Sequence, residues 1–470
     1  MKNKNITYII LFVIFVAALT LPALQTQFKL FELKPLNGET EQVEIVPTFE
    51  NYKSNVLQNQ IDDYLKEHFG FREILIPYYN QYIWDVFNKI ENNGIFLGNN
   101  NWLFFYEHLC DQFESLTYKY ADSGEEMTAI FERDAKATYY LQEILKEYGI
   151  TLFVGIAPSK NELYPELLPE NKQFKRTGGV WADAFYTKRF KELGVNCLDF
   201  NTIYKGLKDS VDYPLFYKSS SHYSMISAAY ETDTLIKYME SISGLNIQNV
   251  EFDKPYAGEA QKIDKDMEKL FNLIRPIEDA EYKYLNVKTI HDETAAKPHW
   301  LTVGDSFFWN LINSIPHAEI FNGTPFWYYN KEVYFDPGHK DVSEVNLLEE
   351  LLKSDIIMIY WCPINLYRLE HGFVINALIS LCYEDNYLEE KKNKIIQNIK
   401  ADQEWYDAVI KQAEEKGISV EQALNDNADY TMKENYEEYF PEIFGDSVPA
   451  IRNSRIKKLA EDKKTKIADI

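Results

Sequence analysis

The stretch Leu301–Trp309 contains the residue of this 470-residue chain that is best placed for nucleophilic chemistry, Ser306. A short apolar segment leads to Gly304, and an apolar helical pattern begins directly after the serine. The glycine permits a sharp turn that lifts a hydroxyl off a sheet edge, and a helix start offers free N–H groups to a developing oxyanion. Ser306 is therefore a candidate nucleophile, although serine is also a favoured N-cap residue and an ordinary helix cap is the alternative.

A serine nucleophile needs a general base within hydrogen-bonding reach, and His222 has the best setting among the eight histidines. It follows three serines and stands just before a helical pattern over residues 225–239, so it would be held at the boundary of an element. The alternative is that His222 only caps or packs at the helix start. His299, on the strand that leads to Gly304, is the second candidate base.

The elements that must position these side chains predict an α/β fold. Apolar segments alternate with helical patterns, which indicates a parallel sheet covered by helices on both faces. Ligands bind such sheets at the carboxyl ends of the strands, so Lys160, Ser306 and Cys362 are expected to share one crevice. The predicted strands are 151–156, 196–200, 301–304 and 355–361, and the predicted helices include 123–148 and 181–193.

An uncharged apolar run over residues 6–24 follows Lys2 and Lys4 and is about long enough to span a bilayer as a helix. Positive charge in front of it places the N-terminus inside the cell and the rest of the chain outside. A cleaved signal peptide is the alternative, but the run is longer than a usual signal core and no clean A-x-A site follows. We expect a single-pass protein of the cell membrane whose main domain lies in the periplasm or outside the cell.

The remaining organisation follows from periodicity and composition. Residues 51–68 and 72–90 are expected to form helices, 95–105 a β-hairpin, and 246–298 a polar excursion between sheet elements. Charged helical patterns continue beyond residue 385. The expected parts are an N-terminal transmembrane anchor and tether (1–28), a helical lead (29–94), the α/β domain (95–385) and a C-terminal helical extension (386–470).

Composition narrows the classes of partner. The chain has 49 basic and 73 acidic residues, a formal net charge of −24, which argues against binding nucleic acid through bulk electrostatics. The cysteines are scattered, with no CxxC pair and no nearby histidine pattern, so we expect no metal site and no cofactor and assign no disulfide. They are Cys110, Cys197, Cys362 and Cys382.

Four segments resemble motifs of the SGNH-hydrolase-like proteins of bacterial exopolysaccharide O-acetylation, the AlgJ/AlgX-like family, and they follow the order of those motifs along the chain. The resemblance covers roughly residues 60 to 370 and implies an SGNH-like fold. Tyr217–Ser224 aligns more loosely with the family's D-x-H-W block. The four segments that carry the resemblance are His68–Arg72, Gly98–Phe105 with its Trp-Leu-Phe, Ala157–Lys160 followed by Tyr164-Pro165-Glu166, and Gly304–Phe307.

By this resemblance Ser306 is the nucleophile and His222 the general base of an acyl transfer. Ser306 would attack an acetyl donor, and a sugar hydroxyl of a polysaccharide would then collect the acetyl group. The oxyanion would be met by the Ser306 N–H and a second donor, for which Lys160 and Asn365 are candidates. The resemblance also implies a membrane-bound O-acyltransferase as the acetyl donor, and a single-pass anchor would keep the domain near it.

The sequence departs from the family where the histidine must be oriented. The family's Asp falls on Ser220 and its Trp on Tyr223, and losing the Asp of a triad can cost several orders of magnitude in rate. Ser220 or a backbone carbonyl would hold the imidazole in a dyad, or Asp212 or Asp305 would substitute, or the site is degenerate. Asp305 is better suited to shaping the turn.

Three functions are therefore weighed. The leading one is an extracytoplasmic, membrane-tethered O-acetyltransferase that acts on a polysaccharide. The second is a carbohydrate esterase that uses the same Ser–His pair with water as acceptor. The third, motivated by Ser220, is a non-catalytic glycan-binding or assembly protein.

Overall fold

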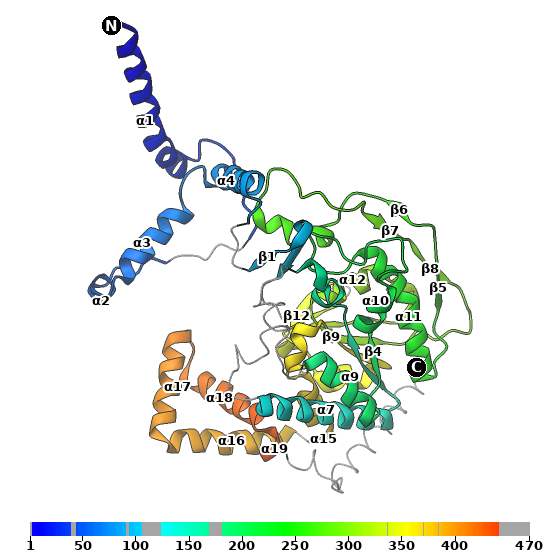
Figure 1. Ribbon diagram of the computed structural model, residues 1–470. Coiled ribbons are helices and arrows are strands. Elements are labelled where there is room, and N and C mark those ends of the chain that lie inside the picture. The colour runs from blue at the N-terminus through cyan, green and yellow to red at the C-terminus, as the bar shows by residue number, and fades with distance from the viewer. Residues whose placement is uncertain are drawn as a thin grey trace. The chain divides into compact units, whose positions relative to one another are not determined.

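The computed structural model of the chain describes residues 2–38, 44–90, 94–105, 124–168, 181–335, 337–369, 371–383 and 385–440 (Figure 1). These form two compact units. The smaller, here the N-terminal unit, is drawn from Met1–Tyr106, Tyr217–Ser221 and Ala260–Ala280, and the larger, here the sheet unit, contains the rest. The expected division at residue 94 differs from the observed one, because two segments distant in sequence join the N-terminal unit.

Four helices begin the N-terminal unit: α1 Lys2–Phe28, α2 Phe49–Lys53, α3 Val56–Glu67 and α4 Arg72–Phe87. The prediction of one helix over 51–68 is wrong in one respect, since Asn55 has φ +64° and separates α2 from α3. A left-handed residue cannot continue an α-helix. Helix α4 follows as expected but ends three residues early, at Phe87, because the next residue, Asn88, has φ +47°.

The predicted hairpin of the N-terminal unit is confirmed. Strands β1 (Ile95–Leu97) and β2 (Leu103–Phe105) pair antiparallel, joined by the 3-10 turn η1 (Asn99–Asn101). Two further 3-10 turns, η4 (Lys262–Lys265) and η5 (Glu268–Phe271), belong to this unit, and η5 supplies Phe271 to its small core. That core consists of Ile95, Leu103, Met267, Phe271 and Ile277.

The sheet unit is built on seven strands in the order β12-β11-β10-β9-β13-β3-β4. The five from β10 to β4 are parallel, which confirms the predicted α/β architecture, and β11 and β12 continue the sheet antiparallel. The strands are β3 Thr151–Ile156, β4 Cys197–Asp199, β9 Trp300–Gly304, β10 Phe326–Tyr328, β11 Glu332–Tyr334, β12 His339–Asp341 and β13 Ile356–Trp361.

Helices cover both faces of this sheet, as alternating side chains of the strands require. Leu152, Val154 and Ile359 belong to a core shared with α7, α9 and α15. On the opposite face Phe153 contacts Tyr238 of α11, and Trp300 contacts Phe308 of α12. The helices are α7 Gly124–Glu147, α8 Lys160–Leu163, α9 Ala182–Leu193, α10 Phe200–Leu207, α11 Met225–Ser243, α12 Phe307–Ser314, α13 His317–Ile320, α14 Leu347–Lys353 and α15 Phe373–Cys382, with 3-10 turns η2 Pro165–Leu167, η6 Val342–Glu344 and η7 Pro363–Arg368.

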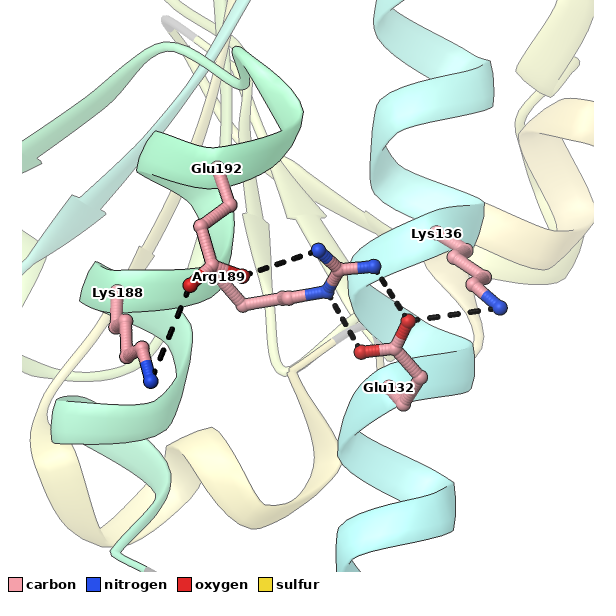
Figure 2. A network of polar contacts seen from close by, with 5 residues as sticks. All are labelled: Glu132, Lys136, Lys188, Arg189 and Glu192. Carbon is pink, nitrogen blue, oxygen red and sulfur yellow. Dashed lines mark hydrogen bonds and ion pairs between the residues drawn. The ribbon is translucent and has the colours of Figure 1, made fainter.

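A charged cluster joins α7 to α9 on the surface (Figure 2). Arg189 of α9 makes a two-pronged contact with Glu132 of α7, at 2.7 Å from Nε to Oε2 and 2.6 Å from Nη2 to Oε1. Lys136 and Glu192 extend the cluster at 3.5 Å and 3.1 Å. The Arg189 guanidinium holds the pKa of Glu132 below its usual value, and this paired geometry fixes the two helices that pack on one side of the sheet.

Two segments complete the sheet unit. The polar excursion forms short antiparallel pairs, β5 (Asn249–Phe252) with β8 (Val287–Ile290) and β6 (Tyr256–Ala257) with β7 (Lys283–Tyr284). The predicted C-terminal helices pack onto the core of the sheet unit through residues such as Ile395, Val409 and Leu424. They are α16 Asp385–Ala401, α17 Gln403–Lys416, α18 Val420–Glu434 and α19 Tyr436–Tyr439.

Candidate active site

The structure places Ser306 at a strand–turn–helix elbow, as predicted. Strand β9 ends at Gly304, and α12 begins at Phe307. Gly304 is required by close packing, because a Cβ there would lie 2.3 Å from the Tyr360 carbonyl oxygen of the neighbouring strand. The Ser306 hydroxyl makes no capping bond to α12, so the alternative of an ordinary helix cap is wrong.

His222 and Ser306 meet across 84 positions of sequence. The distance from His222 Nε2 to Ser306 Oγ is 2.9 Å, within the range of a base that accepts the hydroxyl proton. Both side chains are half-buried, so the pair is accessible to a ligand. The His222 ring also packs on Phe307, with 4.7 Å between ring centroids. The pairing is the geometry that the sequence-based hypothesis required.

Tyr223 and Asn310 hold the histidine segment against the helix that carries the serine. The Tyr223 hydroxyl donates to the Phe307 carbonyl at 3.2 Å, and Asn310 Nδ2 donates to the Tyr223 carbonyl at 2.7 Å. Both side chains are buried. Each of these bonds therefore joins a neighbour of His222 to α12, and they fix the two reacting side chains relative to each other.

Asp305 organises the turn. Its Oδ1 accepts from the Phe307 N–H at 3.0 Å, and its Oδ2 accepts from the Cys362 N–H and from Asn365 Nδ2, both at 2.8 Å. Asp305 therefore ties the turn after β9 to the turn after β13, rather than orienting His222. Because Asn365 Nδ2 donates to Asp305, this candidate oxyanion donor supports the turn that carries Ser306.

The serine run before His222 is anchored within the N-terminal unit. The Ser219 N–H and hydroxyl both donate to Asp279 Oδ2, at 3.1 Å and 2.9 Å. The Ser220 hydroxyl donates to the Ile263 carbonyl at 2.7 Å. Among the residues the structure describes, the exposed Asp212 engages Lys283 only through its backbone carbonyl, at 2.9 Å.

Asp266 is a residue that sequence reasoning missed. Its Oδ1 accepts from the Ser221 N–H at 2.8 Å, and its Oδ2 accepts from the Ser221 hydroxyl at 2.5 Å. Ser221 is bonded directly to His222 in the chain, so Asp266 fixes the residue from which the histidine extends. No motif marks this aspartate, since it lies 45 positions beyond Ser221 in a polar segment.

The other two candidate residues, Lys160 and His299, lie at opposite ends of the parallel strands. Lys160 begins α8 directly after β3, at the same carboxyl edge as Ser306, and is only 4 % exposed. In the described part of the chain the Ser306 N–H donates to no other group, so it is open to an oxyanion. His299 precedes β9 at its amino end, away from this edge, and burial lowers the pKa of its imidazole to about 4.

A buried carboxyl lies under the histidine segment. Glu231 of α11 is 4 % exposed, and burial raises the pKa of its side chain to about 8, against the opposing effect of the Tyr204 and Tyr223 hydroxyls. The folded protein therefore holds a proton on Glu231 at pH values where the unfolded chain has released it.

We expect Glu231→Gln to remove a pH dependence of stability. Between about pH 4.5 and pH 8 the unfolded chain binds fewer protons than the folded one, so the free energy of unfolding falls as pH rises, by up to about 1.4 kcal/mol per pH unit. Urea unfolding from pH 5 to pH 9 should show this fall in the wild type and in the surface control Asp233→Asn, but not in Glu231→Gln. Parallel profiles for all three proteins would contradict the assignment.

A strand–turn–helix elbow on a mostly parallel sheet, with a histidine 2.9 Å from the serine hydroxyl, is an arrangement that serine acyl-transfer enzymes use. Residues 95–305 match the family described as SGNH hydrolase-like domain, acetyltransferase AlgX. The matched region covers less than half of the chain and lies within the residues whose motifs resemble the AlgJ/AlgX-like family. The match ends at Asp305, one residue before Ser306, so it assigns no role to the serine.

Solved structures similar to the chain include the following three. The O-acetyltransferase domain of Pseudomonas putida AlgJ is 13 % identical over 58 % of this chain and 92 % of its own, with a TM-score of 0.37. Bacillus cereus PatB1 is 15 % identical over 58 % of this chain and 97 % of its own, with a TM-score of 0.35. Pseudomonas aeruginosa AlgX is 13 % identical over 57 % and 55 %, with a TM-score of 0.33, so the chain spans about half of AlgX. No curated protein matches the chain significantly.

Proposed function

We propose that the protein is a membrane-tethered O-acetyltransferase, working outside the cytoplasm, that transfers acetyl groups to a polysaccharide through an acyl-enzyme on Ser306. The observation that carries the proposal is the 2.9 Å contact between His222 Nε2 and Ser306 Oγ at the carboxyl edge of the sheet. The AlgX-family match over residues 95–305 supports acetyl transfer as the reaction.

The geometry supports a two-step reaction. His222 Nε2 takes the proton as Ser306 Oγ attacks the acetyl carbonyl, and the Ser306 N–H and a second donor stabilise the oxyanion. Lys160, buried at the same edge, is the remaining candidate for that donor. The donor's leaving group departs with the proton from His222. A sugar hydroxyl then attacks the acyl carbonyl and His222 takes its proton. The acetyl ester forms on the sugar, the bond to Ser306 Oγ breaks, and His222 returns the proton to Ser306 Oγ.

Helix α1 fits the tether in this proposal. Residues Ile6–Phe28 are long and apolar enough to cross a membrane, and the span is not buried inside the protein. The positive N-terminus directs the rest of the chain out of the cytoplasm. There the domain is held near a membrane-bound O-acyltransferase, the donor that the family resemblance implies.

The full chain in detergent micelles, given 4-nitrophenyl acetate and an unacetylated glycan, tests the function. We expect an acetyl adduct on the Ser306 peptide and acetyl esters on the glycan, both detected by mass spectrometry. Release of acetate with no glycan ester, and deacetylation of an acetylated glycan, would instead identify a carbohydrate esterase. Glycan binding with no adduct on Ser306 would identify a non-catalytic binding protein.

We expect Asp266→Asn to lower acetyl transfer by about tenfold or more. The amide leaves one of the two Ser221 donors facing an NH2 group, so Ser221 shifts, and a displaced His222 lowers the rate of proton transfer. Asp279→Asn is the control, since Asp279 Oδ2 accepts from the N–H and the hydroxyl of Ser219, two residues further from His222. Initial rates and urea unfolding are measured for both variants. Equal losses of activity at equal losses of stability would remove Asp266 from the positioning of the base.

A further inference from the structure

Helix α4 directs two amides, Asn80 and Gln81, at the chain around residues 271–275 and exposes a row of apolar side chains to solvent. Asn80 Nδ2 donates to the Phe271 carbonyl at 2.7 Å, and Gln81 Oε1 accepts from the Ile274 and Arg275 N–H groups at 3.1 Å and 2.9 Å. The outward side chains form what we term the tyrosine stripe. It consists of Leu75, Tyr78, Tyr79, Tyr82 and Val86, which are 52, 67, 49, 56 and 56 % exposed.

The spacing of the tyrosine stripe makes it one continuous surface. Its members stand at positions i, i+3, i+4, i+7 and i+11, which fall on a single face of an α-helix. The stripe contains no charged residue. A contiguous exposed apolar surface on a folded protein marks an interaction site, so the stripe requires an apolar or amphipathic partner.

The end of α1 lies against the turn from which α4 begins. Thr26 Oγ1 donates to the His68 carbonyl at 2.7 Å, and a Cβ on Gly70 would lie 2.0 Å from the Pro22 carbonyl oxygen. Phe31 and Phe71 also pack together, with 5.9 Å between ring centroids. Pro22 and Thr26 belong to the last turns of the apolar span Ile6–Phe28. If the span crosses a bilayer, α4 therefore starts at the boundary between lipid and water.

We propose that the tyrosine stripe lies in the headgroup region of the bilayer that holds α1, an inference that rests on the membrane tether of the proposed function. Tyrosine suits this place because its ring is apolar and its hydroxyl stays hydrated, and tyrosine is enriched at membrane interfaces. A bilayer is present wherever the span is inserted, whereas another protein would have to displace lipid from the stripe. The stripe then sets the height of the N-terminal unit above the membrane.

Photo-crosslinking of the full chain tests the proposal. The photoreactive amino acid p-benzoylphenylalanine replaces Tyr78 or Tyr82, and Lys411 serves as control because its side chain is 77 % exposed on α17. The variants are reconstituted in phosphatidylcholine nanodiscs and irradiated. We expect several-fold more lipid adduct at positions 78 and 82 than at 411. Equal adduct at all three positions, crosslinks to a second copy, or crosslinks to another protein in native membranes would overturn the proposal.

Flotation of the wild-type chain with vesicles separates this inference from the tether itself. A chain that floats but gives no lipid adduct at the tyrosine stripe keeps its anchor and loses the proposed contact. A chain that does not float with vesicles loses both, and the acetyl adduct on Ser306 can still be measured in micelles. The two failures are therefore distinguishable from each other and from failure of the Ser306 chemistry.

Discussion

Replacing Ser306 with alanine should lower acetyl transfer by about four orders of magnitude, while the free energy of unfolding changes by less than about 1 kcal/mol. The hydroxyl contacts His222 and does not cap α12, so its loss removes the nucleophile without removing support from the elbow. Asp305 and Gly304 continue to hold the turn. Transfer to the glycan under saturating donor and urea unfolding are the two measurements.

His222→Ala should cost a similar factor, and the double variant should be no worse than either single one, because nucleophile and base act as one unit. Ser314→Ala is the matched control, since Ser314 lies on the same helix and its hydroxyl donates to the Asn310 carbonyl at 2.9 Å. We expect that control to keep nearly full activity. Independent, multiplicative losses for Ser306 and His222 would contradict a shared proton transfer.

The parts of the site that sequence could predict are those carried by regular elements. In the sequence, Ser306 follows the apolar run of strand β9, and His222 precedes the periodic apolar pattern of α11. Both residues therefore stand at a boundary between an apolar element and a polar segment. Because parallel strands end at one edge, topology placed Ser306 there, whereas the pairing of His222 with Ser306 followed from the family motifs. The fold class followed for the same reason, since five parallel strands are bounded by helices.

The supporting residues could not be predicted, because loops without periodicity place them. Asp266 reaches Ser221 from a segment that reads only as polar sequence. Asn365 follows β13, and its partner Asp305 follows β9, so their hydrogen bond depends on how two turns pack. The edge strand His339–Asp341 is exposed throughout and lacks the apolar alternation that would reveal a strand. Asn55 breaks the first lead helix through a single backbone angle.

Tyr223 shows how a departure from the family pattern is accommodated. A Trp side chain at this position could donate only from its ring nitrogen, whereas the Tyr223 hydroxyl donates to the Phe307 carbonyl and contacts the Tyr360 hydroxyl at 3.1 Å. The substitution therefore retains a link between the base segment and α12. The departure at Ser220 is different in kind, because a serine hydroxyl cannot carry the negative charge of an aspartate, and this hydroxyl donates to the Ile263 carbonyl.

Asp305→Asn is expected to destabilise the protein by about 3 kcal/mol and to lower acetyl transfer by about a hundredfold. The carboxylate is fully buried and accepts three hydrogen bonds. An asparagine has one acceptor oxygen and one NH2 group, so in either orientation at least one of the Phe307, Cys362 and Asn365 donors faces another donor. The elbow then shifts, and Ser306 leaves its 2.9 Å contact with His222.

Asp341→Asn separates this effect from the ordinary loss of a carboxylate. Asp341 also accepts from a backbone N–H and a hydroxyl, both of Ser343, but it is exposed to water, so its replacement should cost less than about 1 kcal/mol and leave transfer unchanged. Urea unfolding and the yield of acetyl adduct on Ser306 are compared for both variants. Full adduct formation in a destabilised Asp305→Asn protein would show that Asp305 supports the fold without positioning the nucleophile.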